Sequence, residues 1–339
     1  MNFEYPKKWT IADVRKLASD LNFDRVLIRC PVSNEVLSAI EKEILRNRPD
    51  FTLCLDWSAE SIDLSCLKFV PSVRRLVVQV GLGMCDLTPL KELRQLVELQ
   101  LQVADLVSLD FLSGVNPNLE NLSIGKTRSS KLNLDAIAHF PRLRILRIDG
   151  QSKGIQVIGT LLNLVELSLS SVTLKDLSCL RDHDKLQSIA IKLGSLSDIG
   201  EITCAPNLRY VEFWRIRGLC DILALGQCTN LQYLYLQELQ SVSELPSFRQ
   251  LGKLRRIYLE SMPSLTTLFP ITGAIALEDF GYANAKQFEV SDFDFLENLR
   301  SLRRVAIGFN NTKRNEEMKA RLCKLEYLSN GLGVFEFTE

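Results

Sequence analysis

A phrase of three apolar residues returns along the chain about every 23 residues, from Val73 to Phe309. In each copy an apolar residue is followed by two variable positions, a second apolar residue, one variable position and a third apolar residue. The copies begin at Val73, Leu96, Leu119, Leu143, Leu164, Leu186, Leu208, Leu231, Leu254, Leu277 and Leu302. A fixed period of this length indicates a repeat architecture, in which each copy is a unit that buries its apolar edge against its neighbours.

Within each copy, the second and third apolar residues have the spacing of a short strand. They are two positions apart, so they point to one side of a strand, and the residue between them points to the other side. In the copy that begins at Leu231 they are Leu234 and Leu236, with Tyr235 between them. Stacked copies therefore predict a parallel sheet with one apolar, covered face and one open face.

Eleven copies in register resemble the leucine-rich repeat family, whose strand phrase is Leu-x-x-Leu-x-Leu. The resemblance covers most of the chain and implies an α/β repeat solenoid, a curved horseshoe with a parallel β-sheet on its concave face. The family usually places Asn or Cys three residues after the third apolar position. Here those positions hold Gly81, Ala104, Thr127, Gln151, Val172, Gly194, Ile216, Leu239, Met262 and Ala285, and only Asn310 fits. We therefore expect the turns to satisfy their backbone groups in another way.

The start of the chain predicts a helical cap over residues 1–49. Thr10 with Asp13 three residues later is a helix-start pair, and Ile11, Val14, Leu17, Ala18 and Leu21 follow at helical spacing. A second amphipathic helix is predicted from Val36, Leu37, Ile40, Ile44 and Leu45. Residues 50–312 then form the solenoid, with about 11 full units and one degenerate unit, in which Asp50 takes the first apolar place.

The end of the chain predicts a helix and a strand as a second cap, over residues 313–339. The helical stripe consists of Met318, Leu322, Leu325 and Leu328. Leu332, Phe335 and Phe337 predict one last strand, because they repeat the apolar spacing. With the degenerate ends, about fourteen rungs are expected.

Composition argues against several classes of partner. The 41 basic and 41 acidic residues cancel, and the absence of a long basic tract predicts no nucleic-acid partner. The sequence has no apolar run of about 18 residues, so we expect no membrane span. The first thirty residues have no secretory core, and nine cysteines are scattered without close pairs. These features predict a cytoplasmic protein with reduced thiols.

Residues that could carry chemistry are few. Of two histidines, His183 lies between Asp182 and Asp184, where a triad or metal site competes with a polar turn, and the turn is favoured because apolar arm residues flank it. Ser291–Phe295 offers two carboxylates, and calcium requires more oxygen ligands. Cys220 and Cys228 lack the second pair of ligands that zinc requires. We therefore predict no enzyme activity, no cofactor and no metal site.

One region of the predicted open face differs from the rest. Three consecutive units place aromatic residues there, and none occurs in the same columns between Arg75 and Lys192. The predicted partner-binding set is Tyr210, Trp214, Tyr233, Tyr235 and Tyr258, ringed by Glu212, Gln237, Arg256 and Glu260. Tyrosine, tryptophan and arginine inside a polar rim are typical of an interface hot spot. The alternative is that the rings only pack on one another across strands.

These observations favour a non-catalytic protein–protein interaction module that binds a partner protein on the concave face. An inhibitor or toxin-immunity protein is one such role, and an adaptor or regulatory subunit of a signalling complex is the alternative. A carbohydrate-binding protein is a hypothesis of another class, since stacked aromatic residues beside Glu, Gln and Arg also suit sugars. The absence of an export signal weighs against it.

Overall fold

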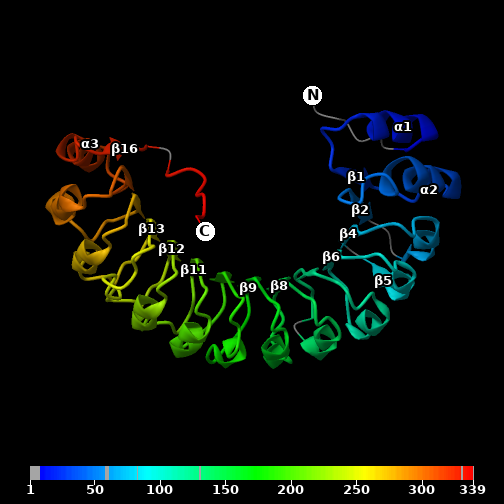
Figure 1. The fold of residues 1–339 in the computed structure, drawn as a ribbon, viewed down its shortest axis with the longest axis horizontal. Coiled ribbons are helices and arrows are strands. Elements are labelled where there is room, and N and C mark those ends of the chain that lie inside the picture. The colour runs from blue at the N-terminus through cyan, green and yellow to red at the C-terminus, as the bar shows by residue number, and fades with distance from the viewer. Residues whose placement is uncertain (1–7, 58–60, 82, 130, 330, 339) are drawn as a thin grey trace. The chain divides into compact units, whose positions relative to one another are not determined.

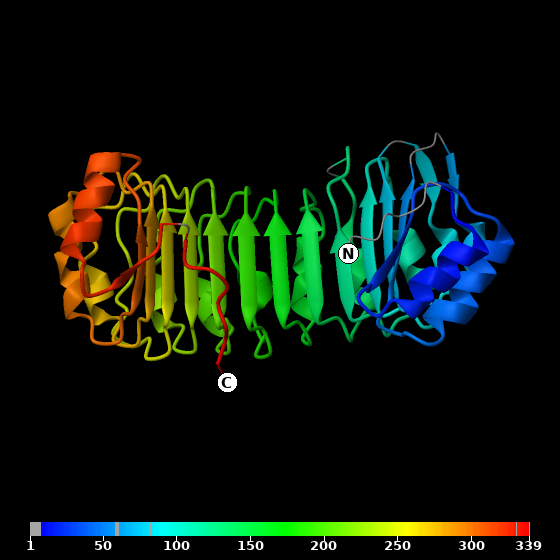
Figure 2. The same cartoon turned by 90° about the horizontal axis from the view of Figure 1, so that it is seen from above.

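The computed structural model describes residues 8–57, 61–81, 83–129, 131–329 and 331–338. The chain divides into two compact units, Met1–Asn163 and Leu164–Glu339, which we call unit 1 and unit 2. In each unit, parallel strands lie side by side and short helical arms cover one face of the sheet (Figures 1 and 2). Each unit is therefore a leucine-rich-repeat solenoid, which confirms the predicted α/β repeat fold. The predicted domain boundaries at residues 49 and 312 stay predictions.

Unit 1 begins with two helices that flank its first strand. The helix α1 (Ile11–Ser19) starts with the predicted capping box of Thr10 and Asp13, and α2 (Asn34–Ile40) continues as a π-helical turn, η1 (Glu41–Leu45). The sheet follows in the order β1 (Arg25–Ile28), β2 (Thr52–Trp57), β4 (Arg75–Val80), β6 (Glu98–Val103), β7 (Asn121–Ile124) and β8 (Ile145–Asp149). The strands β3 (Ser61–Asp63) and β5 (Met84–Asp86) pair separately. The arms are η2 (Ser65–Phe69), η3 (Thr88–Glu92), η4 (Asp110–Gly114), η5 (Leu134–His139) and η6 (Ile155–Thr160).

Unit 2 adds one parallel strand per repeat. Its order is β9 (Glu166–Ser170), β10 (Ser188–Lys192), β11 (Tyr210–Trp214), β12 (Tyr233–Gln237), β13 (Arg256–Glu260), β14 (Asp279–Ala283), β15 (Arg304–Ile307) and β16 (Glu326–Tyr327). The 3₁₀ arms are η7 (Ser178–Leu180), η8 (Gly200–Cys204), η9 (Leu223–Gln227), η10 (Phe269–Gly273) and η11 (Val290–Asn298), and α3 (Thr312–Arg321) precedes β16. We use "open face" for the side of this sheet opposite the arms.

The core is the ladder of apolar phrases. Leu231, Leu234 and Leu236 are fully buried, and the register pairs Leu234 with Ile257 of the next strand. A second buried row lies on the arm side, and it includes Leu225 on η9 and Phe248 in the loop before β13. Each rung thus covers the apolar edge of the next, which is the source of stability in a repeat stack.

The turns after the strands of unit 2 explain how the missing Asn or Cys is replaced. A non-glycine residue with left-handed backbone follows each strand from β9 to β14: Ser171, Leu193, Arg215, Glu238, Ser261 and Asn284. The N–H of Leu193 donates to the carbonyl of Trp214 at 2.8 Å, and the N–H of Glu238 donates to the carbonyl of Glu260 at 2.8 Å. Backbone groups of adjacent rungs therefore satisfy one another at this corner, and no side-chain amide is needed.

The left-handed conformation of Leu193, with φ of 57°, predicts a simple stabilising substitution. An L-residue in this region costs about 1–2 kcal/mol, and Asn tolerates it better than Leu. Leu193 is 40% exposed, so its replacement by Asn gives up only part of the burial of a leucine side chain. We expect Leu193→Asn to raise the free energy of unfolding by about 1 kcal/mol. Urea denaturation followed by circular dichroism would measure this. The control is Leu223→Asn, at a leucine on η9 that is 48% exposed, and it should show no gain in stability. A midpoint at or below that of wild type would contradict the interpretation.

The end of the chain differs from its prediction. The helix α3 ends at Arg321, and Leu332, Phe335 and Phe337 form no strand. Gly331 and Gly333 have φ of 87° and 68°, which turns the backbone away from the stack. Residues 331–338, which we call the C-terminal segment, instead cross the open face over β11–β13 (Figure 2).

Candidate binding surface

The nine residues predicted as a partner site form an array on β11, β12 and β13. The register places Tyr210, Tyr233 and Arg256 in a first row. Glu212, Tyr235 and Tyr258 form the second row, and Trp214, Gln237 and Glu260 form the third row. Because alternate residues of a strand share one side, all nine positions belong to the open face.

The first row lies beneath the C-terminal segment. The ring centroid of Phe335 is 5.2 Å from that of Tyr233, and the ring centroid of Phe337 is 6.3 Å from that of Tyr210. Tyr210 and Tyr233 also contact each other edge to face, at 5.1 Å. The sequence predicted an exposed cluster here, and the structure shows a cluster partly covered by two further rings.

Arg256 is the clearest departure from the prediction. It was expected in an exposed polar rim, but it is only 2% exposed. Its Nη2 lies 2.7 Å from Oδ2 of the buried Asp279, and its Nη1 donates to the carbonyl of Gly333 at 2.8 Å. The expectation of exposure was wrong because the partner carboxylate is buried on β14 and the C-terminal segment bonds directly to the Arg256 guanidinium.

The second row contains a buried carboxylate and two half-buried phenols. Lys192 Nζ lies 2.7 Å from Glu212 Oε2, and the hydroxyl of Tyr210 donates to the same oxygen at 3.0 Å. Burial, reinforced by the Glu212 carboxylate, raises the pKa of Tyr210 far above its usual value. The hydroxyl of Tyr235 donates to Gln237 Oε1 at 2.8 Å, and burial likewise raises the pKa of Tyr235. The phenols of Tyr210, in the first row, and Tyr235, in the second row, therefore stay protonated at neutral pH and donate hydrogen bonds.

The third row is the part that the C-terminal segment leaves open. Trp214, Gln237 and Glu260 are half-buried, and the Trp214 indole donates to Glu238 Oε1 at 3.3 Å. The ring of Tyr258 lies edge to face with that of Tyr235, at 5.2 Å between centroids. These contacts hold large side chains in fixed positions beside the segment.

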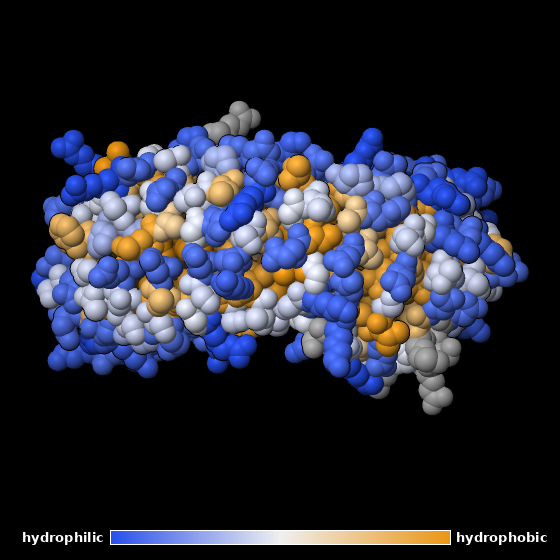
Figure 3. All heavy atoms as spheres, turned by 90° about the horizontal axis from the view of Figure 1, so that it is seen from below, coloured by the Kyte–Doolittle hydropathy of each residue, from blue (hydrophilic) through white to orange (hydrophobic). Residues whose placement is uncertain are grey.

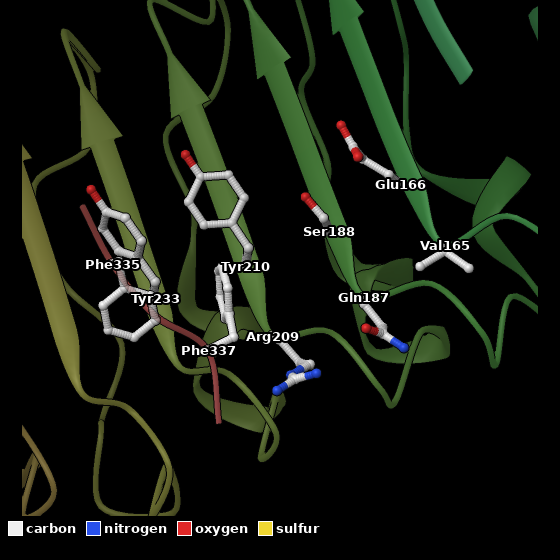
Figure 4. Close-up of a pocket in the computed structure, with 9 residues that line it drawn as sticks. All are labelled: Val165, Glu166, Gln187, Ser188, Arg209, Tyr210, Tyr233, Phe335 and Phe337. Carbon is white, nitrogen blue, oxygen red and sulfur yellow. The ribbon is translucent and has the colours of Figure 1, made fainter. Parts of the chain in front are cut away.

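A cavity of about 500 Å³ lies beside the C-terminal segment. Figure 4 shows its lining: Val165, Glu166, Gln187, Ser188, Arg209, Tyr210, Tyr233, Phe335 and Phe337. The cavity extends from the two phenylalanine rings across the open face toward β10 and β9. It has aromatic walls on one side and polar side chains on the other.

Sequence reasoning missed several residues of this site. Phe335 and Phe337 were assigned to a last strand, although Gly331 and Gly333 beside them are a signal for a change of direction. Arg209 and Gln232 precede β11 and β12 by one residue, so they do not belong to the outward positions of the strand phrase that predicted the array. Each contacts the C-terminal segment, as the ring of Phe337 lies 5.7 Å from the Arg209 guanidinium carbon.

The residues considered for catalysis or metal binding lie in turns and arms. His183 is fully buried in the turn before β10, and its Nδ1 is 3.1 Å from the carbonyl oxygen of Arg181, as a polar turn would have it. Ser291–Phe295 is part of η11. Cys220 is exposed and Cys228 is buried, and burial raises the pKa of the Cys228 thiol to about 11.

Two absences apply to the part of the chain that the structure describes. Within it, no three His, Cys, Asp or Glu residues are grouped so that they could hold a metal ion. Within the same ranges, the helices are all too short or too polar to cross a membrane.

The arm side of the molecule offers a contrast to the array. In Figure 3, which views the molecule from below, apolar atoms are interrupted by hydrophilic side chains. Phe269 on η10 is 69% exposed there. A single exposed apolar side chain is normal on a protein surface, whereas clustered aromatic residues are not.

Comparisons with known proteins confirm the fold. Neither a family model nor a curated protein matches the sequence. Among solved structures, an internalin (InlF) from Listeria monocytogenes matches 95% of this chain and 95% of its own, with 15% identity and a TM-score of 0.65. A leucine-rich repeat protein of Leptospira interrogans matches 96% of this chain and 94% of its own, with 15% identity and a TM-score of 0.52.

A third structure, the functional domain of InlJ from Listeria monocytogenes, matches 86% of this chain and 64% of its own. It has 17% identity and a TM-score of 0.54. The structural likeness establishes a common leucine-rich-repeat fold, and the low identities carry no residue of the array from one protein to another. The function of this surface therefore rests on its own geometry.

Proposed function

We propose that this chain is a non-catalytic protein-binding module and that the open face of unit 2 is its binding surface. The observation that supports this most strongly is the aromatic array on β11–β13, in which the half-buried Tyr235 and Tyr258 pair across two strands and the half-buried Trp214 lies in the next row. Tyrosine and tryptophan in such clusters carry most of the binding energy in protein interfaces.

Side chains of the array are also held in place by contacts within the chain itself. Hydrogen bonds fix Tyr235 to Gln237 and Trp214 to Glu238, and the strands beneath them are packed on the core. Ordering a long side chain at an interface costs about 0.5–1.5 kcal/mol, so preformed positions favour affinity. A sheet that presents fixed aromatic rings is suited to a partner with a complementary surface of its own.

The proposal includes two more specific roles, an inhibitor or toxin-immunity protein and an adaptor. An inhibitor or toxin-immunity protein would cover the working site of its partner, whereas an adaptor would leave that site active. We place the protein in the cytoplasm because its cysteines are odd in number and scattered. Assay of the captured partner's activity, with and without this chain, separates the two roles.

The test is capture of a partner from lysate of the cells that make the protein. Wild type should retain a protein in stoichiometric amounts, and the double variant Trp214→Ala with Tyr235→Ala should retain at least about tenfold less. Phe269→Ala, an exposed aromatic residue on an arm, is the matched control and should bind like wild type. Circular dichroism checks the fold of each variant.

Two outcomes would contradict the proposal. One is a partner that binds wild type and the double variant equally, since the array would then have no part in binding. The other is a lysate in which no protein is retained. Heat of binding to a glycan in titration calorimetry, with no protein captured, would replace the proposal with sugar recognition.

A further inference from the structure

We propose that the open face of unit 2 recognises an extended polypeptide segment with two aromatic side chains separated by one residue. We further propose that the chain's own C-terminal segment holds this site until such a segment of a partner displaces it. The inference rests on the proposed function and names the class of ligand. The C-terminal segment is itself a bound example of that class.

The first support is the way in which the two phenylalanine rings are held. Residues two apart in an extended chain point to one side, so Phe335 and Phe337 both face the sheet (Figure 4). The ring of Phe335 lies 5.3 Å from the guanidinium carbon of Arg255 and 5.0 Å from that of Arg256. Guanidinium groups over ring faces add attraction to the contact with the tyrosines.

The second support is recognition of the backbone. Gln232 Nε2 donates to the carbonyl of Thr338 at 2.8 Å, and the N–H of Thr338 donates to Gln232 Oε1 at 2.9 Å. One side-chain amide thus pairs with both backbone groups of one residue. Arg255 Nη1 adds a bond to the carbonyl of Glu336 at 3.0 Å. These contacts require only an extended backbone, so a segment of another chain can make them equally well.

The third support is that the C-terminal segment fills the site incompletely. Phe337 remains 46% exposed, and the cavity of about 500 Å³ continues beyond it. Gln187, Ser188 and Glu166 line the far side of that cavity. A partner segment that continues across the open face would reach these side chains and gain contacts that residues 331–338 do not make. The C-terminal segment has an advantage over a partner because it belongs to the same chain, which gives it an effective concentration of about millimolar. The additional contacts of the partner segment offset this advantage.

The test uses a fluorescent synthetic peptide with the sequence of residues 331–338 and measures its binding by anisotropy. The receptor is the full chain with Phe335→Ala and Phe337→Ala, whose own segment lacks the rings. We expect this variant to bind the peptide at least tenfold more tightly than wild type. A second receptor that ends at residue 330 replaces the first if the double variant does not fold.

Two controls define the recognition. The first is a peptide of the same composition in which the residues of positions 335 and 336 are exchanged, so that the rings are adjacent and point to opposite sides. It should bind at least tenfold more weakly. The second adds Gln232→Ala to the receptor and should abolish binding, whereas Gln240→Ala, an exposed glutamine in a loop, should not change it.

Several results would overturn the inference. These are failure of the peptide to bind a folded receptor, equal binding of the exchanged peptide, and equal binding to wild type. Failure of this inference is distinct from failure of the proposed function. A partner protein captured by wild type and unaffected by excess peptide would refute the inference alone. Peptide binding without any captured protein would refute the proposed function as tested in lysate.

Discussion

Gly194→Ala is expected to destabilise unit 2 by about 3 kcal/mol, at the upper end of the usual cost of overpacking. A Cβ atom at this position would lie 2.1 Å from the carbonyl oxygen of Val172 and 3.2 Å from its backbone nitrogen. Val172 is fully buried, and its carbonyl accepts a hydrogen bond from the N–H of Ser195. The clash is therefore with backbone of the neighbouring rung, which cannot rotate away as a side chain could.

Gly252→Ala is the matched control for this prediction. No atom lies within 4 Å of the Cβ that it would add, so a change within about 0.5 kcal/mol is expected. Gly273→Ala is an intermediate case, since its Cβ would lie 2.9 Å from the side-chain Cγ of Arg249 and 3.2 Å from the backbone nitrogen of that residue. In urea denaturation, the midpoint should be lowest for Gly194→Ala, intermediate for Gly273→Ala and highest for Gly252→Ala. Equal midpoints for Gly194→Ala and Gly252→Ala would show that Gly194 is not closely packed against the backbone of Val172.

The repeat itself could be predicted because apolar spacing alone determines it. Leu234 pairs with Ile257, and Leu236 pairs with Leu259, in the register that the phrase requires. A one-residue slip would place these side chains on the open face and expose them to water. The cost of such a slip in eleven copies leaves a single arrangement.

The corner after each strand could not be predicted in the same way. Its hydrogen bonds join backbone to backbone, so they leave no preferred side chain in the sequence. Leu193, Arg215 and Glu238 take left-handed conformations there, although none of them is a turn residue. The stack of neighbouring rungs imposes the conformation, and local preference does not decide it.

The array of the candidate site could be predicted from the sequence. The C-terminal segment that covers part of it could not. The nine residues lie at outward positions of adjacent strands, so their proximity follows from the repeat. Phe335 and Phe337 fit a strand phrase as well as they fit an extended segment, because both have the same spacing of two. Only Gly331 and Gly333 distinguish the alternatives, through the left-handed turn that they permit.

Asp279→Ala should have the largest effect on stability, a loss of about 3–5 kcal/mol. Asp279 is buried, and its carboxylate accepts bonds from two arginines. Arg256 Nη2 lies 2.7 Å from Oδ2, and Arg304 Nε lies 2.7 Å from Oδ1. Without the carboxylate, the buried guanidinium of Arg256 keeps carbonyl groups and aromatic rings as neighbours and loses its counter-ion. A buried charge without its counter-ion is costly in a way that an exposed one is not.

The adjacent ion pair provides the control. Glu278 and Arg255 are 3.0 Å apart, and each remains about a quarter to a third exposed. Glu278→Ala should therefore cost about 0.2–1 kcal/mol. Thermal and urea unfolding of both variants would measure the difference. If Asp279→Ala lowered the free energy of unfolding only as much as Glu278→Ala does, water would have to reach Arg256. The C-terminal segment would then not shield Arg256 from solvent.

A double variant separates the lost charge from the lost packing. Arg256→Met with Asp279→Leu removes both buried charges and keeps apolar volume, so most of the stability lost in Asp279→Ala should return. The same double variant removes the bonds from Arg256 to the carbonyls of Leu332 and Gly333. Its stability should therefore recover while its hold on the C-terminal segment stays weakened. The added peptide would lose the same bonds, so the receptor with Phe335→Ala and Phe337→Ala should bind it more weakly once these two substitutions are included. Restored stability together with this weaker binding would assign Arg256 to retention of the segment, because stability of the sheet would no longer depend on it.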